Sequence, residues 1–299
     1  MTNTKLEDRR SKLWRTKPGL VIYTANELAK FVNHVGIALI RTNEKFPLPS
    51  LLTAINGNYD NHSQISKNEL KPFLDDFFNT IHRTKQAVEV ISFDESTCVV
   101  SEKVFINLYA LQIERSSKNS TFNNLPIKRY TRFERELYEI VHKEGPVSRK
   151  SLILRLNLTT RKSRKLLDQT LNKLWKKIWI IRVSKSAEGN IWKATSTFDK
   201  QITKKALSIK RNVALDNLIV AVINSSVAIT RHQIRQLLKN ISSYEEVDET
   251  ITSLILKNVI QIDPSVIIHG KKALTLVQAV KRIVNPLTQF NMFKLSETE

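Results

Sequence analysis

The sequence predicts a mainly helical protein with small β-hairpins, an α+β chain built from tandem winged helix-turn-helix domains. One observation behind this is that segments with helical periodicity, often preceded by Ser or Thr, cover most of the chain. A second is that three helical segments followed by a hairpin occur twice, the order of a winged helix. A third is the charge: 48 Lys and Arg against 28 Asp and Glu give +20. Such a surplus favours a polyanionic partner, above all nucleic acid.

The first expected domain, a winged-helix-like unit, covers residues 24–115 and follows an N-terminal extension over residues 1–23. Thr24 and Glu27 have the spacing of a capping box, which predicts a helix start. Ser101 is expected to cap a later helix. The expected elements are helices over residues 24–40, 68–86 and 102–112 and short strands over residues 88–91 and 97–100. A polar stretch then predicts a linker over residues 116–130.

The second expected domain, residues 131–205, has the clearest winged-helix order. Ser148 is expected to cap its second helix, and a turn containing Gly189 separates two runs rich in β-branched and aromatic residues. Its three Trp residues, at positions 175, 179 and 192, are interpreted as core. The expected elements are helices over residues 131–143, 149–156 and 160–178 and strands over residues 179–184 and 191–198.

The third expected domain, residues 206–280, repeats this order and precedes a tail over residues 281–299. Thr230 is expected to cap its second helix, and either Ser242 or Ser243 its third. The expected elements are helices over residues 211–224, 231–240 and 244–257 and a hairpin built from residues 259–263, 266–269 and 273–277.

The positive charge is concentrated in the middle of the chain. Residues 143–211 hold 19 basic and 4 acidic side chains, which is three quarters of the total surplus. Residues 212–299 hold 9 basic and 8 acidic side chains and are almost neutral. A concentrated block is typical of a phosphate-binding surface, although a solvated lysine-rich face has the same composition.

The third helix of the central domain is the candidate recognition helix. On a helical wheel Leu167, Leu171, Leu174 and Ile178 lie on one side, and the opposite side is basic and amide-bearing. Lys and Arg can bind phosphates or guanine edges, and Asn and Gln can pair with adenine. With the hairpin included, the expected DNA-binding residues are Arg161, Lys162, Lys165, Gln169, Asn172, Lys173, Lys176, Arg182, Lys185 and Lys193. An ordinary amphipathic surface helix is the alternative.

The corresponding helix of the last domain begins with acidic residues, Glu245, Glu246, Asp248 and Glu249. Acidic side chains suit a helix N-terminus but repel phosphates. This domain is therefore expected to pack or to contact a protein partner, while three residues of the preceding helix could still reach the DNA backbone: Arg231, His232 and Arg235.

The sequence contains no recognisable catalytic, cofactor or metal motif. Nucleotide-binding glycine loops and the H-E-x-x-H zinc motif are absent, and the six histidines lack zinc-ligand spacing. Cys98 is alone, which indicates a reducing compartment and a buried, inert thiol. No apolar run has the length of a membrane span, and the N-terminus does not look like a signal peptide. We therefore expect no cofactor, no metal, no membrane and a cytoplasmic protein, with the nucleoid as an alternative location.

The order of several blocks resembles the winged-helix proteins related to the AlkZ/YcaQ DNA glycosylase family. The blocks are FVNHVGIALI (31–40), PLPSLLTAINGN (47–58), KNELKPFLDDFFNTIHRTKQ (67–86) and TRFERELYEIVHKEGPVSRKSLILRLNL (131–158). The resemblance implies tandem winged helices around a concave, basic DNA-binding surface.

The glycosylase branch of that family uses a Gln-x-Gln or Gln-x-Asp element near its N-terminal helix. The nearest block of this chain reads Val32-Asn33-His34-Val35 instead. The resemblance therefore implies the non-glycosylase branch, and no catalytic residue is carried over. Asn33 and His34 are kept as candidate ligand-side residues, with simple solvent exposure as the other interpretation.

Three functions remain open at this stage. The first is a non-enzymatic protein that binds duplex DNA through the central recognition helix. The second is a divergent glycosylase that acts on alkylated bases or crosslinks. The third is a winged-helix assembly module that binds protein through its last domain.

Overall fold

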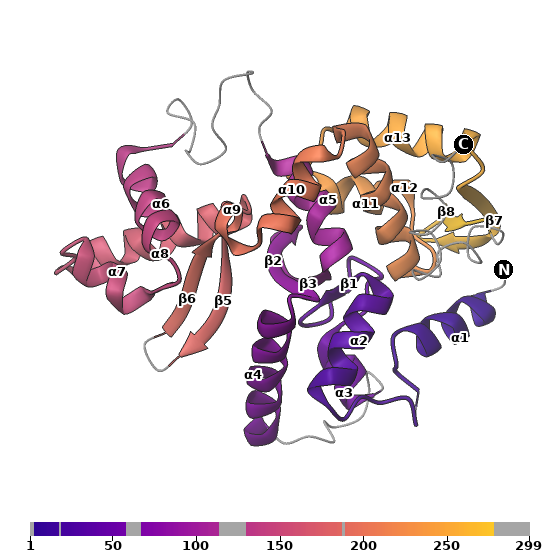
Figure 1. Cartoon of the computed structure of the whole chain (residues 1–299). Helices are drawn as coiled ribbons and strands as arrows, with labels where there is room; N and C mark the ends of the chain where they lie inside the picture. Colours follow the sequence, from indigo (N-terminus) through magenta and orange to yellow (C-terminus); the bar gives the residue numbers. More distant parts are fainter. Residues whose placement is uncertain (1–2, 18, 58–66, 114–129, 187–188, 278–299) are drawn as a thin grey trace, which may run out of the picture.

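The computed structural model of the chain describes residues 3–17, 19–57, 67–113, 130–186 and 189–277. Helices dominate, and the strands of these residues form small antiparallel sheets (Figure 1). The predicted α+β class is confirmed at that level. The expected linker over residues 116–130 lies outside the described residues except for Tyr130, and the expected tail over residues 281–299 lies wholly outside them.

The N-terminal region surrounds a sheet with the strand order β1-β3-β2. Val100 of the central strand lies opposite Ile37 on one side and Val88 on the other. The elements are α1 (Asn3–Leu13), α2 (Ala25–Val35), β1 (Ile37–Leu39), α3 (Leu51–Asn56), α4 (Lys67–Thr84), β2 (Ala87–Phe93), β3 (Ser96–Ser101) and α5 (Glu102–Gln112). Cys98 in β3 is fully buried, and burial raises the pKa of its thiol, so the prediction of a buried Cys98 is confirmed.

Helix α2 begins as predicted but ends earlier. The Thr24 hydroxyl accepts a hydrogen bond from the Glu27 amide, and the Glu27 carboxylate accepts one from the Thr24 amide, so the capping box is present. The prediction of a helix up to residue 40 is wrong. Gly36 adopts φ 86° and donates its N–H to the Val32 carbonyl, which ends the helix. The next residues then pair with β3 as β1.

The expected N-terminal extension contains α1, which was not predicted. Leu6 of this helix is buried together with Val266 of the C-terminal hairpin. Just after the helix, the Trp14 indole donates a hydrogen bond of 2.8 Å to the Ser225 carbonyl. Helix α1 and Trp14 therefore pack against the C-terminal region.

The central region has its own sheet with the order β4-β6-β5. Its elements are α6 (Arg132–Glu144), β4 (Val147–Ser148), α7 (Arg149–Arg155), α8 (Arg161–Lys176), β5 (Ile180–Ser186) and β6 (Gly189–Ala194). The prediction of a strand up to residue 198 is wrong. Ala194 lies opposite Ile180, the first residue of β5, so no partner strand extends further. The chain turns there into a short helix, α9 (Thr195–Phe198).

The C-terminal region repeats the order of three helices and a hairpin after one additional helix, α10. Its elements are α10 (Lys200–Ser208), α11 (Arg211–Ser226), α12 (Arg231–Leu238), α13 (Tyr244–Leu256), β7 (Ile260–Ile268) and β8 (Lys271–Leu276). Thr230 caps α12, and Ser243 rather than Ser242 caps α13. Helix α10, capped by Asp199, was not predicted, and the expected domain boundary at residues 205 and 206 falls inside it.

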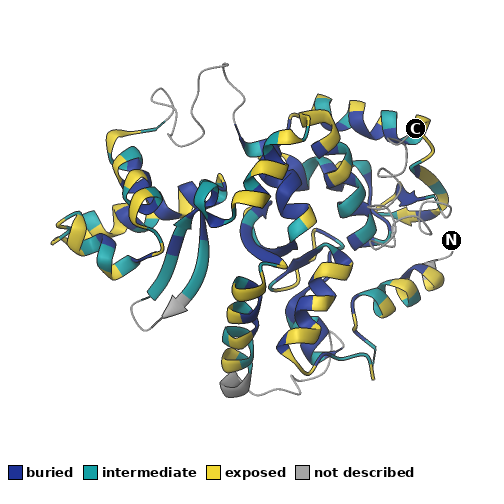
Figure 2. Cartoon of the chain, in the orientation of Figure 1, coloured by how far each residue is buried: buried dark blue, intermediate teal, exposed yellow. Residues whose placement is uncertain are grey.

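The N-terminal and C-terminal regions share one hydrophobic core. It includes Phe105 and Leu108 of α5 together with Leu215 and Leu218 of α11. Figure 2 shows the buried residues concentrated where these helices meet the β2–β3 pair. The central region has a core of its own that includes Leu171, while its Ile178 and Ile181 belong to the shared core. Figure 1 shows the central region beside α4 and β2, on the opposite side from α12 and α13.

Candidate nucleic-acid interface

The framework of the candidate interface is α8. The Thr160 hydroxyl accepts a hydrogen bond from the Ser163 amide and caps the helix. The predicted apolar face is buried, with Leu167, Leu171 and Leu174 at most 2% exposed. Burying one face of the helix fixes which side chains the other face presents to solvent.

The exposed side of α8 carries the predicted basic and amide residues, together with Leu166 and Lys177, in two rows. Positions three or four residues apart share a row on a helix. We call the first row the cavity row, because it ends at a cavity that Lys173 and Lys177 line. It contains Lys162, Leu166, Gln169, Lys173 and Lys177. The second, called the turn row, contains Arg161, Lys165, Asn172 and Lys176. All these residues are exposed except the half-buried Lys176.

The beginning of both rows consists of cations that face solvent without an acidic partner. Among the described residues, Arg161, Lys162 and Lys165 form no ion pair. The one acidic residue of α8, Asp168, is held in a bidentate pair by Arg149 of α7, at 2.6 and 2.8 Å. The hydrogen bonds that Arg149 donates to Asp168 raise the pKa of its guanidinium. Because Asp168 is neutralised within the fold, the exposed face stays positive.

The later residues of the rows are paired within the molecule. Lys173 donates to the Glu134 carboxylate at 2.6 Å, and its ammonium group lies 5.4 Å from the ring centre of Tyr130. Lys176 pairs at 2.9 Å with Glu95, in the turn between β2 and β3. These two predicted DNA-binding residues therefore also stabilise the fold.

The turn that receives Lys176 joins all three regions. Its two residues, Asp94 and Glu95, both have positive φ values, 47° and 61°. Lys239, directly after α12, forms an ion pair with Asp94. An acidic turn from the N-terminal sheet therefore lies between lysines of the central and C-terminal regions, at the end of the turn row.

The hairpin residues lie differently from the expectation. Arg182 forms an ion pair with Glu89 of β2, which is 1% exposed, and packs over the rings of Phe78 and Trp175 at 5.4 and 5.5 Å. The structure thus places Arg182 in the contact between two regions and away from the exposed rows. Lys193 in β6 is half-buried. Lys185 belongs to β5, and its side chain is outside the described part of the structure.

The contact around Arg182 includes a largely buried histidine. His82 of α4 lines a cavity of about 260 Å³ together with Phe78 and Arg182. Burial, and then the charge of Arg182, lower the pKa of His82 to about 4. This histidine is therefore neutral at physiological pH.

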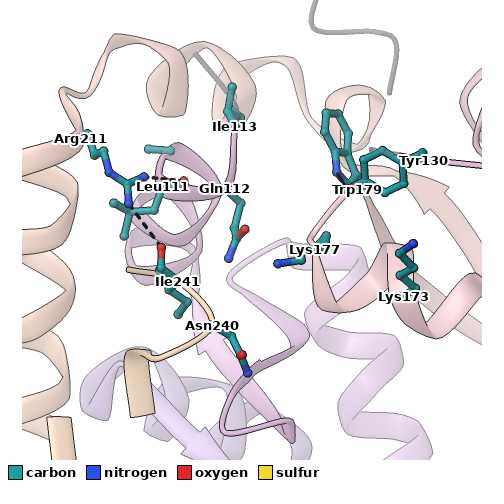
Figure 3. Close-up of a pocket in the computed structure, with 11 residues that line it drawn as sticks. Leu111, Gln112, Ile113, Tyr130, Lys173, Lys177, Trp179, Arg211, Asn240 and Ile241 are labelled. Carbon is teal, nitrogen blue, oxygen red and sulfur yellow. Dashed lines mark hydrogen bonds between the residues drawn. The ribbon is translucent and has the colours of Figure 1, made fainter. Parts of the chain in front are cut away.

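A larger cavity of about 480 Å³ lies at the end of the cavity row (Figure 3). Lys173 and Lys177 of the central region line it together with Gln112, which ends α5. Across from them lie Arg211 at the start of α11 and the stretch after α12. The full lining is Ala110, Leu111, Gln112, Ile113, Tyr130, Lys173, Lys177, Trp179, Arg211, Asn240 and Ile241.

Sequence reasoning missed most of this cavity. Of its lining, only Lys173 is among the predicted DNA-binding residues. Lys177 could have been found, because it follows Lys173 by four residues on the same helix face. Gln112, Arg211 and Asn240 come from segments far apart in sequence, so no local pattern could have placed them together.

The remaining candidate residues lie elsewhere. Asn33 and His34 are exposed on the last turn of α2, and neither lines the larger cavity. In α13, Glu246 pairs with Arg211, and Asp248 with Arg235. The hydrogen bond from Arg211 holds the pKa of Glu246 below its usual range. Within the described ranges, His, Cys, Asp and Glu do not gather into groups that could hold a metal ion. None of the described helices combines the length and apolar character needed to cross a membrane.

The fold is similar to a solved structure, the Streptomyces sahachiroi DNA glycosylase AlkZ. The similarity has a TM-score of 0.58 and covers 95% of this chain and 72% of AlkZ, at 12% sequence identity. No family model and no curated protein matches the sequence. The resemblance expected from the order of blocks is therefore confirmed at the level of the fold, which does not by itself define a function.

Proposed function

We propose that this protein is a tandem winged-helix protein that binds duplex DNA. In the central domain, residues 131–205, the order of helices and hairpin fits a winged helix whose α8 is the recognition helix. The remaining domain limits, residues 24–115 and 206–280, belong to the same proposal. The similarity to the fold of a DNA glycosylase supports a role on DNA.

The observation that carries this proposal is the unpaired cationic start of α8. Arg161, Lys162 and Lys165 project from one exposed face, and Gln169 and Asn172 lie one to three turns further along it. Cations at the helix start can bind phosphates, while the two amides can pair with base edges. Arg182 is left out of the proposed contact set because Glu89 holds it inside the molecule.

A salt titration of duplex binding tests the proposal. The logarithm of the binding constant should fall linearly with the logarithm of salt concentration, at about −0.9 per neutralised phosphate. Replacing Arg161, Lys162 and Lys165 together by Ala should make this slope shallower by about three and weaken binding about a hundredfold at moderate salt. Fluorescence anisotropy on a labelled duplex measures both.

The matched control is a triple Ala variant of the C-terminal region, at Lys257, Lys271 and Lys272. It removes the same formal charge from exposed positions outside the proposed interface. Its slope should stay within about one of the unmodified protein. Equal losses in the two triple variants would show that net charge, and not α8, determines binding.

DNA glycosylase activity is a second candidate function, favoured by the AlkZ-like fold alone. Incubation with duplexes carrying alkylated bases, followed by assay for abasic sites, tests it. Product formation that depends on Asn33 or His34 would support the catalytic alternative. Absence of abasic sites across several lesions would leave binding as the function.

A further inference from the structure

The cavity at the end of the cavity row contains groups that phosphate binding does not require. Its aromatic wall is Trp179 and Tyr130 (Figure 3). The Trp179 indole donates a hydrogen bond of 2.7 Å to the Tyr130 hydroxyl, and the two rings meet edge-to-face at 86°. Trp179 also packs edge-to-face against Tyr138 of α6, at 5.6 Å between ring centres. The indole is therefore held in one orientation at the cavity wall.

Two amide side chains line the same cavity. Gln112 is half-buried and Asn240 exposed, and within the described part of the chain neither amide group has a hydrogen-bond partner. Figure 3 shows Gln112 and Lys177 pointing into the same space. A side-chain amide has both a hydrogen-bond donor and an acceptor. The polar edge of a nucleobase has complementary donors and acceptors, so the two can pair.

The charge balance of the lining argues against a site for several phosphates. Glu134 neutralises Lys173, and Glu246 neutralises Arg211 in a bidentate pair of 2.8 and 3.0 Å. Arg211 also donates to the carbonyls of Leu111 and Ile241. Among the described lining residues, Lys177 alone keeps a charge without an acidic partner. One free cation beside aromatic and amide groups suits a base with a single flanking phosphate.

The cavity is connected to the proposed DNA-binding face. Lys162 and Lys177 are fifteen residues apart in α8 and its C-cap, which corresponds to about 22 Å along the helix axis. The cavity row between them is exposed throughout. A DNA backbone that follows this row arrives at the mouth of the cavity.

We propose that this cavity binds a nucleobase that is unpaired and displaced from the helical stack. The proposal rests on the proposed duplex binding by α8 and names its preferred substrate class: duplex DNA with an unpaired nucleotide. The base lies against Trp179 and Tyr130, Gln112 and Asn240 bind its polar edge, and Lys177 binds the flanking phosphate. Sequence tolerance is expected from stacking, because every base has an aromatic face.

The test compares two duplexes that differ by one unpaired central nucleotide, with fluorescence anisotropy as the measurement. The full-length protein should bind the duplex with the unpaired nucleotide about tenfold more tightly. The double variant Gln112→Ala, Asn240→Ala should lose most of this preference and bind the paired duplex as before. The matched control, Lys162→Ala, should weaken binding to both duplexes equally. A 2-aminopurine at the unpaired position should change its fluorescence with the unmodified protein and not with the double variant.

The outcomes separate this proposal from the function on which it rests. Equal binding of both duplexes by the unmodified protein, or a preference that survives in the double variant with the 2-aminopurine signal unchanged, overturns the cavity proposal and leaves duplex binding standing. Binding to neither duplex overturns both. Binding only to the duplex with the unpaired nucleotide, lost in the double variant, supports the cavity and contradicts general duplex binding.

Discussion

The central region, α6 to β6, and the C-terminal region, α11 to β8, both place three helices before a hairpin, but the first is basic and the second is almost neutral. Both join their second and third helices by a bidentate Arg–Asp pair, Arg149 with Asp168 and Arg235 with Asp248. On α8 the remaining exposed charges are positive, whereas the first turn of α13 is acidic. The comparison teaches that a shared backbone order leaves the exposed chemistry free to differ.

The two regions also differ in how they attach to the N-terminal sheet. The C-terminal region shares a continuous apolar core with α5. The central region has a core of its own, and it attaches through two buried isoleucines, Ile178 and Ile181, and through polar and aromatic groups. Arg182 pairs with Glu89, and the Trp175 indole donates to the Glu89 carbonyl at 3.2 Å. Directional contacts of this kind fix how the cationic face of α8 is oriented relative to the other regions.

The largest expected effect comes from a substitution that breaks the polar attachment of the central region to the N-terminal sheet. Arg182→Ala should lower the free energy of unfolding by about 3–5 kcal/mol, because it breaks the ion pair of a carboxylate that is 1% exposed, Glu89. Arg235→Ala, which removes a partly exposed pair in the C-terminal region, should cost much less. Urea unfolding measures both. The double variant Glu89→Met, Arg182→Met should recover most of the loss, and similar costs for both single variants would contradict the comparison.

A smaller effect is expected on the pH dependence of stability, through His82, which lies in the same attachment. The pKa of His82 is about 4 in the folded protein and about 6.5 in an unfolded chain. The unfolded chain therefore takes up a proton between these values that the folded protein does not, so stability falls as pH is lowered through this range. We expect a loss of about 2 kcal/mol from this group between pH 7 and pH 5.

Urea unfolding of a His82→Gln variant at the two pH values tests this prediction. The variant should lack this part of the pH dependence. His232→Gln, at an exposed histidine of α12, is the control and should behave as the unmodified protein does. An unchanged pH dependence in His82→Gln would show that other groups cause it.

The smallest expected effect comes from comparing an acidic residue next to α8 with an acidic residue on α13. Glu95→Gln releases Lys176 at the end of the turn row and should strengthen duplex binding about threefold. Glu249→Gln on α13 removes the same charge from an exposed position and should change binding less than twofold. Anisotropy at fixed salt compares the two variants. Equal gains would place α13 as near to the DNA as α8.

Local patterns in the sequence predict most of the helix starts. Thr24, Ser101, Ser148 and Thr230 cap the helices expected of them, because a cap depends on residues within three or four positions. The apolar face of α8 was likewise predictable from its period. The ends of strands were harder to predict. Strand β6 ends opposite the first residue of β5, so its end depends on a second segment of the chain.

In the candidate site, too, the sequence predicts the features that depend on nearby residues and not those that depend on distant ones. The exposed basic face of α8 follows from composition and periodicity, so Arg161, Lys162 and Lys165 were expected where they lie. Arg182 could not be placed correctly, because its partner Glu89 is 93 residues away in the sequence. Helices α1 and α10 were missed, and the contact of Trp14 with Ser225 shows that α1 is anchored by a distant region.

The sequence by itself determined the helical class, the helix caps and the concentration of positive charge in the middle of the chain. These depend on hydrogen bonds and side-chain periods that span a few residues. Only the tertiary structure decided which cations remain free, which are paired, and that Gln112, Lys177, Trp179 and Asn240 line one cavity. Those outcomes depend on packing between segments distant in the chain, where burial and partner geometry select the arrangement.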